Sequence, residues 1–177
     1  MRKLLARTFL RLTGWVPDGD RPSAPRFVLI AAPHTSNWDF VVGIAAKFGM
    51  GLGVFWLGKD ALFRFPLGVL MRRFGGIPVD RTTSNDVVGG IVQEFSRRDR
   101  LMLAIAPEGT RKRVERWRTG FYHIAHGARV PILPVALNWS ERAIQIGAPF
   151  TTTGDVDTDM RELQRRFSGV GGRRSKT

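Results

Sequence analysis

The sequence contains no cysteine among its 177 residues. This absence excludes a disulfide scaffold, a thiolate metal site and a cysteine nucleophile. The phosphate-binding motif Gly-x-x-x-x-Gly-Lys and the Gly-x-Ser-x-Gly elbow of serine acyl-enzymes are missing as well. The glycines at positions 49, 51 and 53 precede an expected strand instead of following one, which is the wrong order for a dinucleotide-binding fold.

Acidic residues are scarce relative to basic ones. Against 28 Lys and Arg there are 15 Asp and Glu, which gives a formal net charge of +13 and a pI near 11.6. Such an excess indicates an anionic partner: nucleic acid, anionic lipid head groups or a phosphorylated substrate. The sequence shows no recognition helix or stacking motif of a nucleic-acid-binding module, so no nucleic acid is expected as a partner.

The sequence also lacks a long apolar run. A helix that spans a bilayer needs roughly 20 apolar residues. The longest candidate, residues 40–58, contains Lys47 and five glycines. We expect this stretch to form a helix, a turn and a strand, and we predict no transmembrane segment.

Apolar runs of buried-strand type alternate with segments of helical periodicity, which predicts a single α/β domain with a mostly parallel, possibly mixed, central sheet covered by helices. The two prolines of strand 130–138 predict that it lies at an edge or a bulge. Strands are expected at 26–32, 53–58, 76–80, 101–106, 130–138 and 143–146, and helices at 1–13, 38–49, 67–74, 86–98, 119–128 and 155–167.

Three parts are expected along the chain. Residues 1–16 read as a basic amphipathic helix, residues 17–169 as the main domain, and residues 170–177 as a disordered basic tail. The N-terminal helix is of the kind that lies in a membrane interface. Docking of its apolar stripe on the core is an equal and compatible alternative. Its two faces hold Lys3, Arg7 and Arg11 on one side and Leu5, Phe9, Leu12 and Val16 on the other.

One of only three histidines directly follows an expected buried strand, with an aspartate five residues later. A carboxylate within reach of an imidazole holds the ring in one tautomer and stabilises its charged form, so His34 is a candidate general base with Asp39 as its partner. Asp39 also suits the cap of the helix expected from Trp38, and the two roles are compatible.

A second polar cluster follows the strand expected at 101–106. It contains Glu108, Gly109, Thr110 and Arg111. Glycine allows a sharp turn and a close ligand approach, and arginine offers a rigid fork of donors that matches phosphate oxygens. Because ligands bind beyond the carboxyl ends of parallel strands, we expect this cluster and His34 at one edge of the sheet.

His123 and His126 are three residues apart on an expected helix, a spacing that can bind metal. Glu115 is too far away to complete a site, so we expect no metal here.

Four short motifs occur in a fixed order, and together they are more specific than any one of them. They are His34-x-x-x-x-Asp39, Gly75-x-x-Pro78-x-x-Arg81, Pro107-Glu108-Gly109-Thr110-Arg111, and the apolar segment Val130-Pro131-Ile132-Leu133-Pro134-Val135.

In their order and spacing these motifs resemble the glycerolipid acyltransferase family, which includes the 1-acylglycerol-3-phosphate acyltransferases. The resemblance covers roughly residues 25–150, so 17–169 would be an acyltransferase domain. The chain departs from the family pattern at Pro33, where asparagine is common, and at Pro78, where phenylalanine is usual. It is also short for the family and lacks the usual longer N-terminal membrane helices.

The resemblance implies an O-acyltransferase of phospholipid biosynthesis. His34 would take a proton from a hydroxyl of a lysophospholipid such as 1-acylglycerol 3-phosphate, and Asp39 would orient His34. The resulting alkoxide would attack the thioester of acyl-CoA or acyl carrier protein. Backbone N–H groups near Gly109 would form the oxyanion hole. No metal or organic cofactor is required.

The remaining site residues also follow from the resemblance. Arg81, Thr110 and Arg111 would hold the acceptor's phosphate or other anionic head group. Glu108 would position the acceptor or fix its loop by pairing with an arginine. Lys59 lies either near the acceptor site or serves as a helix-entry charge.

The basic composition, together with the resemblance, places the protein in the cytoplasm, peripheral on the inner face of the cell membrane. The alternatives are an acyltransferase for another lysolipid, such as lyso-ornithine lipid, and a non-catalytic basic module that binds lipid or nucleic acid.

Overall fold

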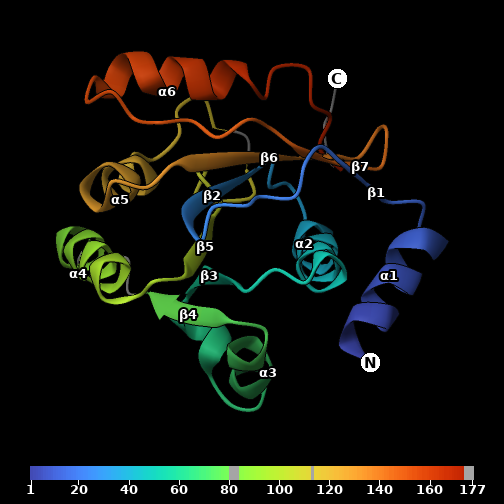
Figure 1. The fold of residues 1–177 in the computed structure, drawn as a ribbon. Helices are drawn as coiled ribbons and strands as arrows, with labels where there is room; N and C mark the ends of the chain where they lie inside the picture. The colour runs from blue at the N-terminus through green and yellow to red at the C-terminus, as the bar shows by residue number, and fades with distance from the viewer. Residues whose placement is uncertain (80–83, 113, 174–177) are drawn as a thin grey trace.

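Seven strands form one sheet in the order β1-β7-β6-β2-β5-β3-β4 (Figure 1). The computed structural model describes residues 1–79, 84–112 and 114–173. Strands β2 to β6 run parallel to one another, whereas β7 is antiparallel to β6 and parallel to β1. The predicted single α/β domain with a mostly parallel, mixed sheet is confirmed. The strands are β1 (Val16–Asp18), β2 (Arg26–Ala32), β3 (Val54–Lys59), β4 (Gly76–Val79), β5 (Leu101–Ile105), β6 (Ile132–Asn138) and β7 (Ala143–Ile146).

Helices cover both faces of the sheet (Figure 1). Side chains of α1 and α2 share one apolar cluster with Phe27 of β2, and side chains of α4, α5 and α6 share a second cluster with Val28 and Ile30. This alternation along β2 explains why its sequence is apolar from Phe27 to Ala32, since both faces are covered. The helices are α1 (Arg2–Leu12), α2 (Asn37–Met50), the 3₁₀ turn η1 (Asp60–Phe63), α3 (Leu67–Arg73), α4 (Ser84–Arg97), α5 (Gly120–Ala128) and α6 (Val156–Arg165).

The prolines of strand 130–138 predicted an edge position or a bulge, and the edge position is wrong. β6 lies inside the sheet, between β2 and β7. The carbonyl of Pro134 accepts a hydrogen bond from the N–H of Gly147, one residue beyond the end of β7. The N–H and C=O of a strand residue point to the same side, so the missing N–H of Pro134 faces the end of the β7 ladder. A proline is tolerated there although the strand is internal.

The N-terminal helix docks on α2 mainly by a side adjacent to its predicted apolar stripe, and of that stripe Phe9 packs partly against the same apolar cluster. Ala6 and Leu10 are buried, and the Nε of Arg7 donates to the carbonyl of Gly49 at 3.0 Å. Leu5 and Leu12 remain 64% and 82% exposed. The helix is therefore fixed to the domain while apolar side chains still face outward.

Residues 170–173 lie against the loop that follows β2, in contrast to the expected disordered tail from residue 170. The N–H of Trp139 donates to the carbonyl of Gly171 at 2.9 Å. The guanidinium of Arg173 lies over the rings of Trp38 and Trp139. Within the described residues, no helix has both the length and the apolar character needed to cross a membrane.

Candidate active site

The turn from β2 into α2 is fixed by a capping box. The hydroxyl of Ser36 accepts a hydrogen bond from the N–H of Trp38 at 3.1 Å, and the carboxylate of Asp39 accepts one from the N–H of Ser36 at 2.6 Å. Such reciprocal bonds satisfy N–H groups that the first turn of a helix leaves without partners. The predicted capping role of Asp39 is confirmed, and it places the Asp39 carboxylate against the loop that carries His34.

Asp39 is a buried carboxylate surrounded by donors. Its Oδ2 accepts from the N–H groups of Thr35 and Ser36, both at 2.6 Å, and its Oδ1 accepts from Nε1 of Trp139 at 2.7 Å. The Nδ1 of His34 lies 3.3 Å from Oδ2. Burial by itself raises the pKa of Asp39, but hydrogen bonds from His34, Ser36, Trp139 and Thr35 outweigh it and hold that pKa below its ordinary value.

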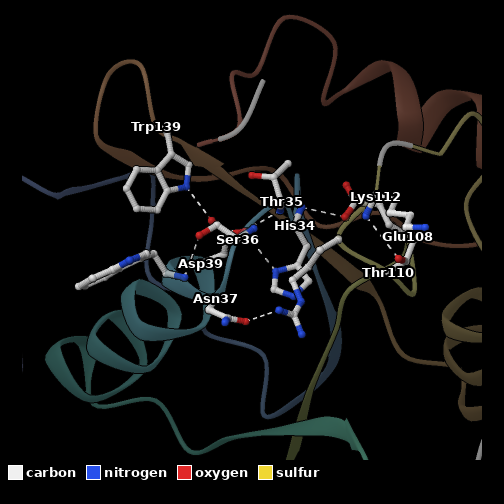
Figure 2. A network of polar contacts seen from close by, with 11 residues as sticks. His34, Thr35, Ser36, Asn37, Asp39, Glu108, Thr110, Lys112 and Trp139 are labelled. Atoms are coloured by element: carbon white, nitrogen blue, oxygen red, sulfur yellow. Dashed lines mark hydrogen bonds and ion pairs between the residues drawn. The ribbon is translucent and has the colours of Figure 1, made fainter. Parts of the chain in front are cut away.

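Glu108 approaches the same loop from the neighbouring strand. β2 and β5 are parallel, with Ile30 opposite Ile105, so the residues after both strands meet at one sheet edge. The N–H of His34 donates to Oε2 of Glu108 at 2.8 Å. The expected proximity of the two motifs is therefore confirmed. Glu108 holds the His34 loop by accepting a hydrogen bond from a backbone amide, whereas the expectation for loop fixation was pairing with an arginine. Figure 2 shows His34 between Asp39 and Glu108.

The two carboxylates differ in their electrostatic environment. Burial raises the pKa of Glu108, and repulsion by Asp39 adds to this. The single backbone hydrogen bond and the nearby His34 only partly oppose that rise. Asp39 is thus held in its charged form, whereas Glu108 is shifted toward its protonated form.

The loop after β5 turns sharply at Gly109, whose φ of +66° lies in the left-handed region. A Cβ at this position would lie 2.8 Å from Nε of Arg118. The predicted need for glycine is therefore confirmed. The next residues approach α2, since the guanidinium of Arg111 donates to Oδ1 of Asn37. Thr110 is exposed, and its hydroxyl accepts from the N–H of Lys112 at 3.3 Å.

The other two predicted binding residues are not part of this hydrogen-bonded network. Lys59 ends β3 at the same edge of the sheet and is exposed. Across the described ranges, no hydrogen bond or ion pair joins Lys59 to His34, Asp39 or Glu108. Arg81 lies outside the described residues.

Sequence reasoning missed Trp139. Its indole N–H donates to Asp39, and its ring packs edge-on against Trp15 with centroids 4.9 Å apart. A signal was available, because Trp139 directly follows β6, the other neighbour of β2 in the sheet. A polar or aromatic residue after that strand falls at the edge that carries His34.

A cavity adjoins this network. It has a volume of about 340 Å³ and is lined by Ser36, Asn37, Trp38, Arg111 and Arg173. A larger cavity of about 620 Å³ lies between α4 and α5, beside Arg26 at the start of β2. That cavity is at the opposite edge of the sheet from His34, so the smaller one is the relevant space for chemistry.

No group of three or more Asp, Glu or His side chains in the described part of the chain is arranged to hold a metal ion. The ring of His126 stacks on Tyr122, and its Nδ1 lies 2.9 Å from Oγ1 of Thr152.

The fold and the site define a class: an α/β protein with a histidine–aspartate pair and a second carboxylate at the carboxyl ends of parallel strands, suited to base-assisted group transfer. The model of the Acyltransferase family matches residues 19–138. The chain belongs to this family, as its motifs predicted.

Relatives of known function are similar over part of their length. The chain is 30% identical over 122 residues to the 1-acyl-sn-glycerol-3-phosphate acyltransferases of Escherichia coli K12 and Salmonella typhimurium. The match covers 65% of this chain and 48% of each relative, so the chain spans about half the length of these relatives. The fold is similar to the crystal structure of the 1-acyl-sn-glycerophosphate acyltransferase PlsC from Thermotoga maritima. That comparison gives a TM-score of 0.62 at 15% identity and covers 97% of this chain and 80% of that one.

The pKa of Asp39 generates a prediction about stability. Asp39→Asn is expected to lower the free energy of unfolding at neutral pH by about 1–3 kcal/mol, because the donors around the carboxylate lose their charged acceptor. The folded-state pKa of Asp39 lies below its unfolded value. Its stabilisation is therefore complete above about pH 4 and is lost as the pH falls through the folded-state pKa. Denaturant unfolding of both proteins across acidic and neutral pH measures this difference.

Glu108→Gln is the matched control, because the pKa of Glu108 is shifted in the opposite direction from that of Asp39. The raised pKa of Glu108 means that its charged form destabilises the folded state above that pKa. A glutamine keeps a carbonyl oxygen for the N–H of His34, so we expect no loss of stability at neutral pH. A stability difference between the wild type and the Asp39→Asn protein that stays constant with pH would contradict the assignment of the charge to Asp39.

Proposed function

We propose that this chain is an O-acyltransferase that moves a fatty acyl chain from acyl-CoA or acyl carrier protein to the hydroxyl of a lysophospholipid-like acceptor such as 1-acylglycerol 3-phosphate. One observation carries the proposal: a histidine whose Nδ1 faces a buried, ionised aspartate at the edge of the sheet, in a chain of the Acyltransferase family. The names of the relatives support the acceptor class.

His34 is the general base in this proposal. Because Nδ1 faces Asp39, the ring tautomer with the proton on Nδ1 is favoured, and Nε2 is left as the basic atom. Nε2 takes the proton of the acceptor hydroxyl while the oxygen attacks the thioester carbonyl. The C–S bond then breaks, the ester C–O bond remains, and the proton passes from His34 to the leaving thiolate. The protein itself is not acylated.

Asp39 and Glu108 act on this step through position. Asp39 stabilises the imidazolium that forms during proton transfer, and its hydrogen bonds keep the pKa of this carboxylate low despite its burial. Oε2 of Glu108 accepts the backbone N–H of His34 and so fixes the position of His34 at the sheet edge. Gly109 turns the adjacent loop, and its neighbouring N–H groups are our candidates for the oxyanion hole.

The remaining predicted residues would bind the acceptor's anionic head group. Arg111 lies beside the N-terminus of α2 and lines the 340 Å³ cavity. We keep Arg81, Thr110 and Lys59 as proposed acceptor residues on motif position alone, with Arg81 outside the described residues.

The proposal predicts that His34→Ala lowers kcat about 10²- to 10⁴-fold, the range expected for loss of a general base. The assay supplies both acyl-CoA and acyl carrier protein donors with a panel of lysolipids. Thiol release can be followed with a thiol reagent without background from the protein, because the chain has no cysteine. Lipid products are identified by mass spectrometry.

His123→Ala is the matched histidine control, since His123 is exposed on α5, outside the His34 network. It should keep wild-type activity. Full acyl transfer by the His34→Ala protein would reject the mechanism, and no transfer by the wild type to any lysolipid would reject the proposed activity.

We further propose that the protein works as a peripheral protein on the cytoplasmic face of the cell membrane. Exposed apolar side chains gather on η1, α3 and β4, and we call them the α3 patch. Phe65 is 89% exposed, and Arg64, Arg72 and Arg73 are exposed beside it. Apolar side chains mixed with cations suit an anionic leaflet. The α3 patch comprises Leu62, Phe65, Leu67, Val69, Leu70 and Ile77.

The start of α1 lies near this patch. The guanidinium of Arg2 lies 5.9 Å from the ring centroid of Phe48, and that ring is 5.9 Å from the ring of Phe74, at the end of α3. Leu4 and Leu5 of α1 are 69% and 64% exposed. The N-terminal helix and α3 would therefore meet the same lipid surface.

Phe65→Ser is expected to weaken binding to anionic vesicles about tenfold or more, because a buried phenylalanine side chain contributes about 1.5–3 kcal/mol. Arg73→Ala should weaken it less and only at low salt. Flotation with vesicles of phosphatidylglycerol and phosphatidylcholine measures both effects. Arg161→Ala on α6 should change nothing. Equal binding of wild type and the Phe65 variant would refute the α3 patch as the contact.

A further inference from the structure

Residues 170–173 pack closely on the loop that carries His34. The carbonyl of Gly171 accepts from the N–H of Trp139 at 2.9 Å. A Cβ at Gly171 would lie 2.5 Å from Oγ of Ser140, and one at Gly172 would lie 2.7 Å from Cγ2 of Thr35. Two glycines in succession therefore allow this segment to approach both the β6–β7 turn and the His34 loop.

This close approach positions Arg173. Its guanidinium carbon lies 5.0 Å from the ring centroid of Trp38 and 5.2 Å from that of Trp139. Contacts with two indole rings restrict the arginine without neutralising its charge, because a cation–π contact is not an ion pair. Trp139 is also the residue whose indole holds Asp39.

Arg173 and Arg111 come from distant parts of the chain and line the same 340 Å³ cavity. Arg111 is held from the other side by Oδ1 of Asn37. Among the residues that the structure describes, neither guanidinium forms an ion pair with an Asp or Glu side chain. The lining of the cavity therefore has two cations and no anion. Its other residues, Ser36, Asn37 and Trp38, closely follow His34 in the chain.

We propose that Arg173 adds a second guanidinium to the head-group site already proposed for Arg111, so that the two form a clamp for the phosphomonoester of the acceptor, with residues 170–173 as one wall of the site. This proposal rests on the proposed acyl transfer. Paired guanidiniums suit a phosphate dianion, which accepts several charge-assisted hydrogen bonds at once. In 1-acylglycerol 3-phosphate only one carbon and one ester oxygen separate the carbon that bears the reacting hydroxyl from phosphorus. The phosphate therefore has to bind close to the reacting hydroxyl, and a clamp beside the His34 loop is in the right part of the site.

The clamp makes a prediction about selectivity. Arg173→Ala should raise KM for 1-acylglycerol 3-phosphate about 10- to 100-fold with kcat changed less than about threefold, since a hydrogen bond to a charged group is lost. Activity toward monoacylglycerol, which has no phosphate, should not change. Arg173→Lys keeps the charge but not the fork, so it should give an intermediate KM. Arg161→Ala on α6 serves as the control arginine.

Binding without turnover provides the independent readout. Calorimetric titration should show that glycerol 3-phosphate binds the wild type, that Arg173→Ala weakens this binding by a similar factor, and that glycerol does not bind. Inorganic phosphate is titrated in parallel. Phosphate that binds as tightly as glycerol 3-phosphate would overturn the assignment to a lipid head group in favour of free phosphate.

The outcomes separate this inference from the proposed function. If the wild type transfers acyl groups but Arg173→Ala leaves KM and glycerol 3-phosphate binding unchanged, the clamp is wrong and the function stands. If glycerol 3-phosphate binds through Arg173 but no acyl group is transferred, the clamp stands and the function is wrong. Equal losses with phosphorylated and neutral acceptors, together with a lower Tm, would reduce residues 170–173 to a structural strap and overturn the proposal.

Discussion

The buried carboxylate of Asp39 is the group on which the site depends. A charge removed from water is costly unless donors replace the lost hydration, and here the donors come from two parts of the fold that are distant in sequence. Backbone N–H groups of Thr35 and Ser36 belong to the loop after β2, the indole of Trp139 follows β6, and His34 provides the imidazole. Satisfying one charge thus fixes the loop, the start of α2 and the end of β6 relative to one another.

The parallel pairing of β2 and β5 brings a second carboxylate, Glu108, to the site, and its environment differs from that of Asp39. Glu108 has one backbone donor in place of several, and burial dominates its pKa. Two acids near one histidine therefore do not compete for the same role. The low pKa of Asp39 keeps a negative charge beside the ring at neutral pH, whereas Glu108 contributes mainly an acceptor for the His34 amide. This separation follows from the number of N–H groups aimed at each carboxylate, a property of the backbone path.

Much of this arrangement was predictable, because the sequence shows where the buried strands end. Continuous apolar runs located β2 and β5, and the parallel class then placed the residues that follow them at one edge. The rule failed for β6, where Pro134 indicated an edge strand, because a sequence does not reveal that the neighbouring ladder ends beside the proline. The short strand β1 was not predicted, since three exposed residues carry no periodicity. The contacts of Trp139 and of residues 170–173 are between distant segments and have no local signature.

The positively charged side chains of the chain lie in two different environments. The two differ in how strongly salt would weaken their attraction to an anion. Arg64 and Arg73 stand in open solvent beside apolar side chains, where salt weakens their attraction to an anionic surface. Arg111 and Arg173 are exposed too, but they line a cavity and are held by Asn37 and by two indole rings, so the guanidiniums are already positioned and less is lost on binding. A net charge of +13 alone therefore identifies neither site. What assigns each cation is its neighbours: exposed apolar residues indicate a surface, whereas fixed aromatic and amide partners indicate a pocket.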